Sequence, residues 1–124
     1  MRVNDASHDI DRTMTALAHP TRRAILERVM QREARVTELA EPFAMSLNAV
    51  SKHIRVLERA RLVRRRRAWR EHWVSFNPAP LDEVSAWIEK RRVFWTARLD
   101  ALDALLKAED LAAAIPSDKK GKPK

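Results

Sequence analysis

A long stripe of apolar residues in the C-terminal third constrains the fold of this chain more than any other feature. From Leu81 to about Leu111 the pattern is that of one helix, with an apolar residue recurring every seven positions. Such a stripe is longer than one small domain covers, which favours pairing between the helices of two subunits. The alternative is ordinary packing on the domain's own core. The stripe consists of Leu81, Val84, Trp87, Ile88, Trp95, Leu99, Leu102, Leu105 and Leu106.

The composition allows one small domain. The chain has 124 residues, 45% of them hydrophobic, which is enough for a core. It has no cysteine, which excludes disulfides, thiolate metal sites and cysteine nucleophiles and fits a reducing cytoplasm. No segment reaches the apolar length of a membrane span, and the first residues do not form a signal peptide. We therefore expect a cytoplasmic protein that does not contact the membrane.

The first half of the chain predicts four helices. The first covers about residues 8–18, and the second covers about 20–33. Thr37 is a plausible N-cap for a short third helix, which Pro42 limits. Before residue 8 we expect an N-terminal arm (1–7). The inward apolar residues are Ile10, Met14 and Leu17 in the first helix, Ile25, Leu26, Val29 and Met30 in the second, and Leu39 and Ala40 in the third.

The fourth helix, about residues 46–60 with Ser46 as its N-cap, has two different faces. One is apolar, and the other is rich in side chains that bind phosphates and base edges. The apolar residues are Leu47, Val50, Ile54 and Leu57, and the polar ones are Asn48, Ser51, Lys52, Arg55 and Arg59.

A short hairpin follows, with strands over 62–67 and 72–76, although the only glycine of the chain is Gly121 and the turn lacks its favoured residue. The segment 46–75 has nine basic and two acidic residues, so it carries +7 of the total charge of +8. A positive charge concentrated in this way indicates a polyanionic partner. The long last helix ends near residue 111, and we expect 112–124 to be a basic disordered tail.

This order of elements (α-α-α-α-β-β-α) predicts a mainly α, α+β fold of the winged helix-turn-helix type with domain limits 8–111. An α-helix fits the major groove of double-stranded DNA. Asn48 can pair with adenine, and Lys52 and Arg55 can contact guanine or phosphate. His53 either packs or contacts a phosphate, and Trp69 either faces DNA or packs in the turn. The expected DNA contacts are Ser46, Asn48, Ala49, Ser51, Lys52, His53, Arg55, Arg65, Arg66, Arg67, Trp69 and Arg70.

Three segments carry a resemblance to a known family: residues 16–26 (Ala-Leu-Ala-His-Pro-Thr-Arg-Arg-Ala-Ile-Leu), residues 50–57 (Val-Ser-Lys-His-Ile-Arg-Val-Leu), and Leu62-Val63 with the arginines that follow. Over about residues 9–106 the chain resembles the ArsR/SmtB winged-helix transcriptional regulators. The resemblance implies a homodimer, held by its first and last helices, that represses a nearby operon. The expected interface residues are Ile10, Met14, Leu17, Leu81, Val84, Ile88, Trp95, Leu99 and Leu102.

Two departures concern glycine. Arg61 stands where the family has a glycine before Leu62-Val63, and Ala68 and Trp69 stand where it has one in the wing turn. A non-glycine residue in the left-handed conformation costs about 1 kcal/mol. We therefore expect the end of the fourth helix and the wing to differ in shape from those of the family.

Metal sensing is the best-known activity of that family, but the residues here do not support it. The chain offers no thiolate, and residues 81–111 contain carboxylates without a histidine. We expect no metal and no cofactor, and we leave open an unidentified small-molecule effector near Trp87 and Trp95. No nucleophile lies near a base at a recognisable spacing, so we expect no enzyme.

The sequence thus predicts a dimeric, sequence-specific transcriptional regulator, a repressor associated with the bacterial nucleoid. Two alternatives stay open. One is a winged-helix module that binds protein, although an apolar outer face would then be expected where residues 48–59 are polar and basic. The other is non-specific binding of nucleic acid, driven by charge.

Overall fold

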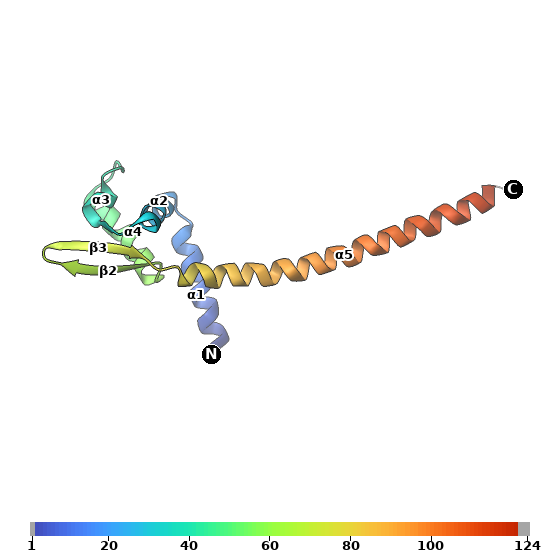
Figure 1. Ribbon diagram of the computed structural model, residues 1–124, viewed down its shortest axis with the longest axis horizontal. Coiled ribbons are helices and arrows are strands. Elements are labelled where there is room, and N and C mark those ends of the chain that lie inside the picture. Colours follow the sequence, from blue (N-terminus) through green and yellow to red (C-terminus); the bar gives the residue numbers. More distant parts are fainter. Residues whose placement is uncertain (1, 122–124) are drawn as a thin grey trace. The chain divides into compact units, whose positions relative to one another are not determined.

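The computed structural model describes the backbone of residues 2–121 and the side chains of residues 9–113 (Figure 1). The chain forms two units, Met1–Ser85 and Ala86–Lys124. The expected fold class, mainly helical with a small antiparallel sheet, is confirmed. The elements in chain order are α1 (Arg2–Leu17), α2 (Pro20–Gln31), β1 (Ala34–Arg35), α3 (Val36–Ala40), α4 (Leu47–Arg59), β2 (Val63–Ala68), β3 (Glu71–Phe76) and α5 (Ala79–Gly121).

Helix starts follow local capping chemistry. Pro20 takes the first turn of α2, and Nδ1 of His19 accepts a hydrogen bond from the Thr21 N–H at 3.1 Å. Ser46 caps α4 as expected, because its Oγ accepts a hydrogen bond from the Ala49 N–H at 3.1 Å. The prediction that Thr37 is the N-cap of α3 was wrong. That position belongs to Arg35, whose backbone N–H donates to the Glu38 carboxylate at 2.9 Å.

The two terminal helices are longer than expected. Residues 2–7, expected as an arm, belong to α1, since no proline or glycine interrupts them. Most of the segment expected as a disordered tail belongs to α5, which continues to Gly121. The run of alanines over 112–114 has the highest helix propensity and extends the helix past Leu111. The last three residues, 122–124, lie outside the described part.

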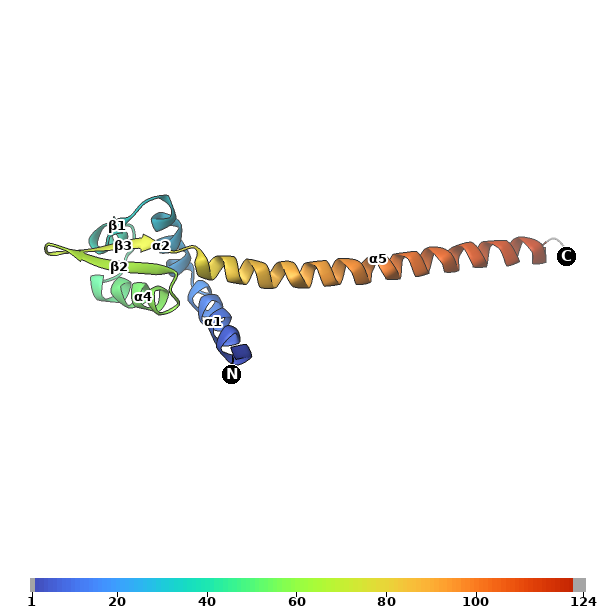
Figure 2. The same ribbon diagram turned by 60° about the horizontal axis from the view of Figure 1, so that its bottom comes forward.

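The sheet has three antiparallel strands in the order β1-β3-β2 (Figure 2). Sequence analysis missed β1, because a strand of two residues has no periodicity to detect. Ala34 of β1 and Arg65 of β2 flank Val74 of β3 from opposite sides. The β2–β3 hairpin, which we call the wing, is therefore joined to the segment between α2 and α3.

The hydrophobic core is formed mainly by residues of α2, α3, α4 and the sheet. Val50, Ile54 and Leu57 of α4 are completely buried, as expected from their spacing. Leu47 is not part of this face, contrary to expectation, because it is the first residue of α4 and its side chain is 50% exposed. The core residues are Ala16, Ile25, Leu26, Val29, Ala34, Val36, Leu39, Val50, Ile54, Leu57, Ala60, Leu62, Val63 and Val74.

The end of α4 has a Schellman arrangement without glycine. The Arg61 N–H donates to the Glu58 carbonyl at 2.9 Å, and the Leu62 N–H donates to the Leu57 carbonyl at 3.0 Å. Arg61 has φ = 64°, as does Trp69 in the wing turn. Both positions that lack the family's glycine thus adopt the left-handed conformation nevertheless.

Asn77, between β3 and α5, connects several chain segments. Its backbone N–H donates to the Leu62 carbonyl at 2.9 Å, and its side-chain amide donates to the Arg61 carbonyl at 2.7 Å. Its Oδ1 also accepts a hydrogen bond from the Ala79 N–H at 3.4 Å, in the first turn of α5. One side chain therefore holds the end of α4 and the start of α5.

The residues expected at a subunit interface differ in burial. In α1, Ile10 is half-buried and Met14 is exposed. Leu17 and Leu81 pack partly against the core of their own chain, and Val84 is 8% exposed. Farther along α5, in the second unit, apolar side chains are about half exposed, among them Ile88 and Trp95. No helix in the described residues has the length and apolar character needed to cross a membrane.

Candidate nucleic-acid interface

The outer face of α4 presents a stripe of polar side chains. Asn48, Lys52 and Arg55 are exposed and are separated by four and three residues, which places them on one side of the helix. Complete burial of the opposite face fixes this orientation, because rotating α4 would expose core residues to water. Ser51 and Ala49 are half-buried at the edges of the stripe, and the Ser46 hydroxyl is occupied in the helix cap.

His53 lies away from this stripe. Its ring is 4.4 Å from the ring of His19, centroid to centroid, and its Nδ1 is 3.4 Å from a guanidinium nitrogen of Arg22. Burial lowers the pKa of His53, and the charges of His19 and Arg22 lower it further. Of the two roles expected for His53, this geometry favours packing against the start of α2 over contact with a phosphate.

The arginine run of β2 is divided between the two faces of the sheet. Successive side chains of a strand point to opposite faces, so Arg65 and Arg67 share a face with the buried Val63, toward α4. Arg64 and Arg66 lie on the other face. The register places Arg67 opposite His72 and Arg66 opposite Trp73. Four consecutive arginines therefore have different surroundings.

Arg66 is engaged within its own chain. Its guanidinium donates two hydrogen bonds to the Glu33 carboxylate, at 2.8 and 2.9 Å, and lies 5.6 Å from the centroid of the Trp73 ring. Arg35 lies 5.8 Å from the same centroid and donates to Glu71 at 2.8 Å. The hydrogen bond from Arg66 lowers the pKa of Glu33. These contacts tie the wing to β1.

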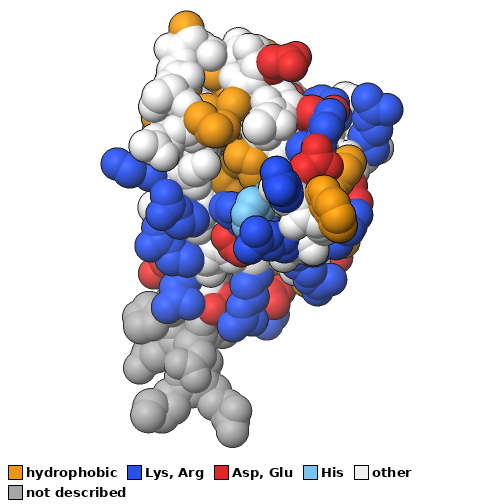
Figure 3. Space-filling model, turned by 90° about the vertical axis from the view of Figure 1, so that its left-hand side faces the viewer, with side chains coloured by type: hydrophobic (Ala, Val, Ile, Leu, Met, Phe, Trp, Pro, Cys, Tyr) orange, Lys and Arg blue, Asp and Glu red, His pale blue; other side chains and the backbone are white. Residues whose placement is uncertain are grey.

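The remaining wing arginines differ in how far they are paired. Arg65 lies near Glu58, with 3.5 Å between Nε and the carboxylate oxygen, and its Nε is buried without a hydrogen-bond partner. Arg67 and Arg70 are exposed and form no ion pair among residues 9–113. Trp69 is 89% exposed in the wing turn, so it does not pack there. Figure 3 shows many Lys and Arg side chains, with some Asp and Glu among them, over the middle and lower part of the face in view.

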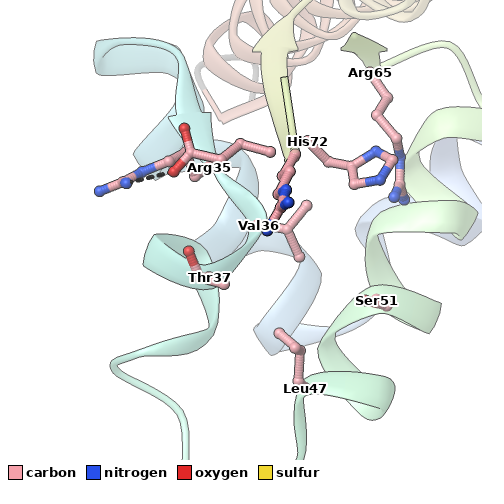
Figure 4. A pocket seen from close by; sticks show the side chains of 9 residues that line it. Arg35, Val36, Thr37, Leu47, Ser51, Arg65 and His72 are labelled. Carbon is pink, nitrogen blue, oxygen red and sulfur yellow. Dashed lines mark hydrogen bonds and ion pairs between the residues drawn. The ribbon is translucent and has the colours of Figure 1, made fainter. Parts of the chain in front are cut away.

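A cleft of about 370 Å³ lies between α3, α4 and the wing (Figure 4). We call it the wing cleft. It brings together the expected contacts Ser51, Arg65 and Arg70 with two residues that sequence analysis did not place among the DNA contacts, Thr37 and His72. Their juxtaposition depends on the pairing of β1 with β3, for which the sequence has no signal. The lining residues are Arg35, Val36, Thr37, Leu47, Ser51, Arg65, Arg70, Glu71 and His72.

Among the described residues, no three histidine, aspartate or glutamate side chains come together as a group that could hold a metal ion. The four histidines belong to different elements, and those described, His19, His53 and His72, do not gather with carboxylates.

Comparisons with known proteins agree with this geometry. A family model described as a helix-turn-helix domain matches residues 17–66. The chain is 37% identical over 99 residues to the HTH-type transcriptional regulator Rv2034 of Mycobacterium tuberculosis, a match that covers 80% of this chain and 90% of the relative.

Solved structures have the same fold. The crystal structure of an ArsR family transcriptional regulator, RHA00566, is 34% identical with a TM-score of 0.70, over 73% of this chain and 93% of that one. A homodimeric winged helix-turn-helix DNA-binding domain from Mycobacterium bovis, solved by NMR, has 23% identity and a TM-score of 0.61, over 73% and 84% of the two chains. The second similarity concerns the fold alone. Because the matches to Rv2034 and RHA00566 exceed 30% identity and cover most of each chain, this chain belongs to the ArsR family of DNA-binding winged helix-turn-helix transcriptional regulators.

Proposed function

We propose that this protein is a repressor that binds a palindromic site in double-stranded DNA as a homodimer, without control by a metal ion and without enzymatic activity. The observation that carries the proposal is the exposed stripe of Asn48, Lys52 and Arg55 on a helix whose opposite face is completely buried. A helix held in this way can enter the major groove and present these three side chains to base edges and phosphates.

The charge distribution supports binding to the DNA backbone. The segment 46–75, with its net charge of +7, covers α4 and the wing. Arg67 and Arg70 have no carboxylate partner among residues 9–113, so their charges are available to phosphates. Trp69 is exposed at the turn beside them. We propose that the wing contacts the backbone next to the groove that α4 occupies, with Arg67, Trp69 and Arg70.

The apolar side chains of α5 support a homodimer. Ile88, Trp95, Leu99 and Leu102 share one face of the helix and are 49–59% exposed. Apolar side chains aligned in this way are typical of an interface. The Mycobacterium bovis domain with the same fold is a homodimer. A dimer also places two recognition helices on successive major grooves, about 34–36 Å apart.

The proposal that no metal ion controls the protein rests on the side chains that could act as metal ligands. Transition metals need thiolates, or imidazole and carboxylate groups gathered at one point. This chain has no cysteine, and residues 9–113 contain no such group. Release from DNA is then left to an organic ligand, to a partner protein, or to a change in protein concentration.

The test compares two labelled duplexes by fluorescence anisotropy: the DNA upstream of the gene, and a random sequence of equal length. The proposal expects the upstream duplex to bind about 10³-fold or more tightly. It also expects affinity to fall by three to five decades between about 50 and 200 mM salt, because a dimer that neutralises roughly 6–10 phosphates releases their counterions. Equal affinity for both duplexes would indicate non-specific binding. A flat salt response would contradict the role of the arginines.

A further inference from the structure

The wing cleft collects hydrogen-bond donors from three separate elements. Thr37 comes from α3, Ser51 from α4, and Arg65, Arg70 and His72 come from the wing. Arg65 and His72 are on the same face of the sheet, since the strand partner of Arg65 is Val74 and that of Arg67 is His72. Figure 4 shows both side chains reaching from the wing toward α4. A group held in the cleft would therefore meet donors from both sides.

The cleft lacks an uncompensated negative charge. Glu71 is its only acidic residue, and it accepts a hydrogen bond from Arg35 at 2.8 Å. Arg35 is thereby neutralised as well, and its pKa is raised by the bond to Glu71 and, to a smaller extent, by Glu38. Of the arginines that line the cleft, Arg70 has no ion pair among residues 9–113, and Arg65 has only the 3.5 Å contact between its Nε and the Glu58 carboxylate.

Arg65 is incompletely satisfied by its own chain. Its side chain is 23% exposed, so most of it is removed from water, and its Nε has no hydrogen-bond partner. The 3.5 Å between this atom and Glu58 is an ion pair without a hydrogen bond. A guanidinium in such surroundings gains from an anionic oxygen that accepts from it, because charge-assisted hydrogen bonds are the strong ones.

From this arrangement we infer that the wing cleft binds one phosphate group of the DNA backbone, held by Arg65, Arg70 and His72 from the wing and by the hydroxyls of Ser51 and Thr37 from the helix-turn-helix. The inference rests on the DNA binding in the proposed function and deepens it. A phosphate bound in the cleft would contact the wing and α4 at the same time and so fix the position of both on the DNA backbone. The occupant is a phosphodiester, because α4 and the wing, which flank the cleft, are the elements that approach DNA in the proposed function.

The first experiment measures the affinity of purified variants for a random duplex as a function of salt. Arg65→Gln is expected to bind about tenfold more weakly and to lower the slope of log K against log [salt] by about one per subunit. Ser51→Ala is expected to weaken binding with an unchanged slope, since a hydroxyl carries no charge. The control is Arg64→Gln, which removes the same charge from the opposite face of the same strand and is expected to alter affinity much less. Equal effects of Arg64→Gln and Arg65→Gln would overturn the inference.

The second experiment does not depend on substituting Arg65, whose loss could disturb the fold. The side-chain nitrogens of His72 are followed by NMR, with His72→Gln to assign the signals, while either the random duplex or inorganic phosphate is added. The inference expects the duplex to shift these signals and phosphate alone, at the same concentration, to leave them in place. Saturation by inorganic phosphate without competition from the duplex would instead identify a site for a free anion and overturn the inference.

The two claims fail in different ways. Since a random duplex is used throughout, loss of preference for upstream DNA would overturn sequence-specific repression and leave the cleft untouched. Strong binding of the duplex by the wild type, with no signal shift of His72 and no effect of Arg65→Gln, would overturn the cleft and leave the proposed function standing.

Discussion

Arg66 donates hydrogen bonds to both carboxylate oxygens of Glu33, at 2.8 and 2.9 Å. DNA would have to compete with this carboxylate for Arg66, whereas Arg67 has no carboxylate partner among residues 9–113. We predict that Arg67→Ala weakens binding to a random duplex about tenfold and lowers the slope of log K against log [salt] by about one per subunit. Arg66→Ala, with the same loss of charge, has a clearly smaller effect. Anisotropy titrations at several salt concentrations check this, and a larger loss for Arg66→Ala would contradict it.

A glycine at the end of α4 should make the folded protein more stable. Arg61 has φ = 64°, a conformation that costs an arginine about 1 kcal/mol more than a glycine. We predict that Arg61→Gly raises the free energy of unfolding by up to about 1 kcal/mol, reduced by the greater freedom of glycine in the unfolded chain. The control is Ala60→Gly, where φ is −82° and the same glycine should destabilise. Urea unfolding of both variants decides the matter; equal effects would contradict the strain at Arg61.

The burial of His53 predicts a dependence of stability on pH. Its pKa lies below the ordinary value of 6.5, so below pH 6.5 the unfolded chain binds more protons at this residue than the folded one. Its contribution to stability is present above 6.5 and is lost as the pH falls through the folded pKa. His53→Gln should therefore lose less stability than wild type between about pH 7.5 and about pH 5.5. Parallel pH dependences of wild type and variant in urea unfolding would contradict the prediction.

The α5 face predicts where subunit contact is sensitive to charge. Trp95 and Val93 are almost equally exposed, at 59% and 58%, but only Trp95 lies on the stripe with Ile88 and Leu102. We predict that Trp95→Glu gives monomers that bind DNA poorly, since burying an unpaired carboxylate is costly. Val93→Glu should stay dimeric. Sedimentation at micromolar concentration checks both, and a wild-type monomer that binds a palindrome tightly would refute the arrangement.

Metal independence is tested on chelator-stripped protein. Zinc, nickel, copper and cadmium are added in turn to the protein bound to its upstream DNA, and the affinity is measured by gel shift. We predict no change with any of them, because residues 9–113 hold no group of suitable ligands. A tenfold loss of affinity at a stoichiometric amount of one metal, equivalent to about 1.4 kcal/mol of coupling, would show a site that the donor set does not reveal.

Sequence analysis anticipated those parts of the fold that depend on local chemistry. The cap at Ser46 and the buried face of α4 follow from residue types within a few positions of one another. The strands of the wing were correctly placed to within a residue or two, without a glycine in the turn. The exposed stripe of Asn48, Lys52 and Arg55 follows from the same periodicity, although its role toward DNA stays a prediction.

The features it missed depend on contacts between distant residues. Glu33 and Arg66 are 33 positions apart, and only the pairing of β1 with β3 brings that part of the chain to the wing. A two-residue strand has no pattern that predicts this pairing. The wing cleft was missed for the same reason, since Thr37 and His72 belong to elements that meet only in the folded chain. The tertiary structure therefore determines which arginine of the run forms an ion pair.

The hydrogen bonds of Asn77 have a mechanical consequence. The nitrogen of one planar amide side chain donates to the Arg61 carbonyl, two residues beyond the end of α4, and its oxygen accepts from the first residue of α5. Because this group is rigid, the first turn of α5 cannot rotate or slide relative to the end of α4 unless one of these bonds breaks or α4 follows. A displacement of the first turn of α5 would therefore be transmitted through these two hydrogen bonds to the end of α4, the helix that carries Asn48, Lys52 and Arg55.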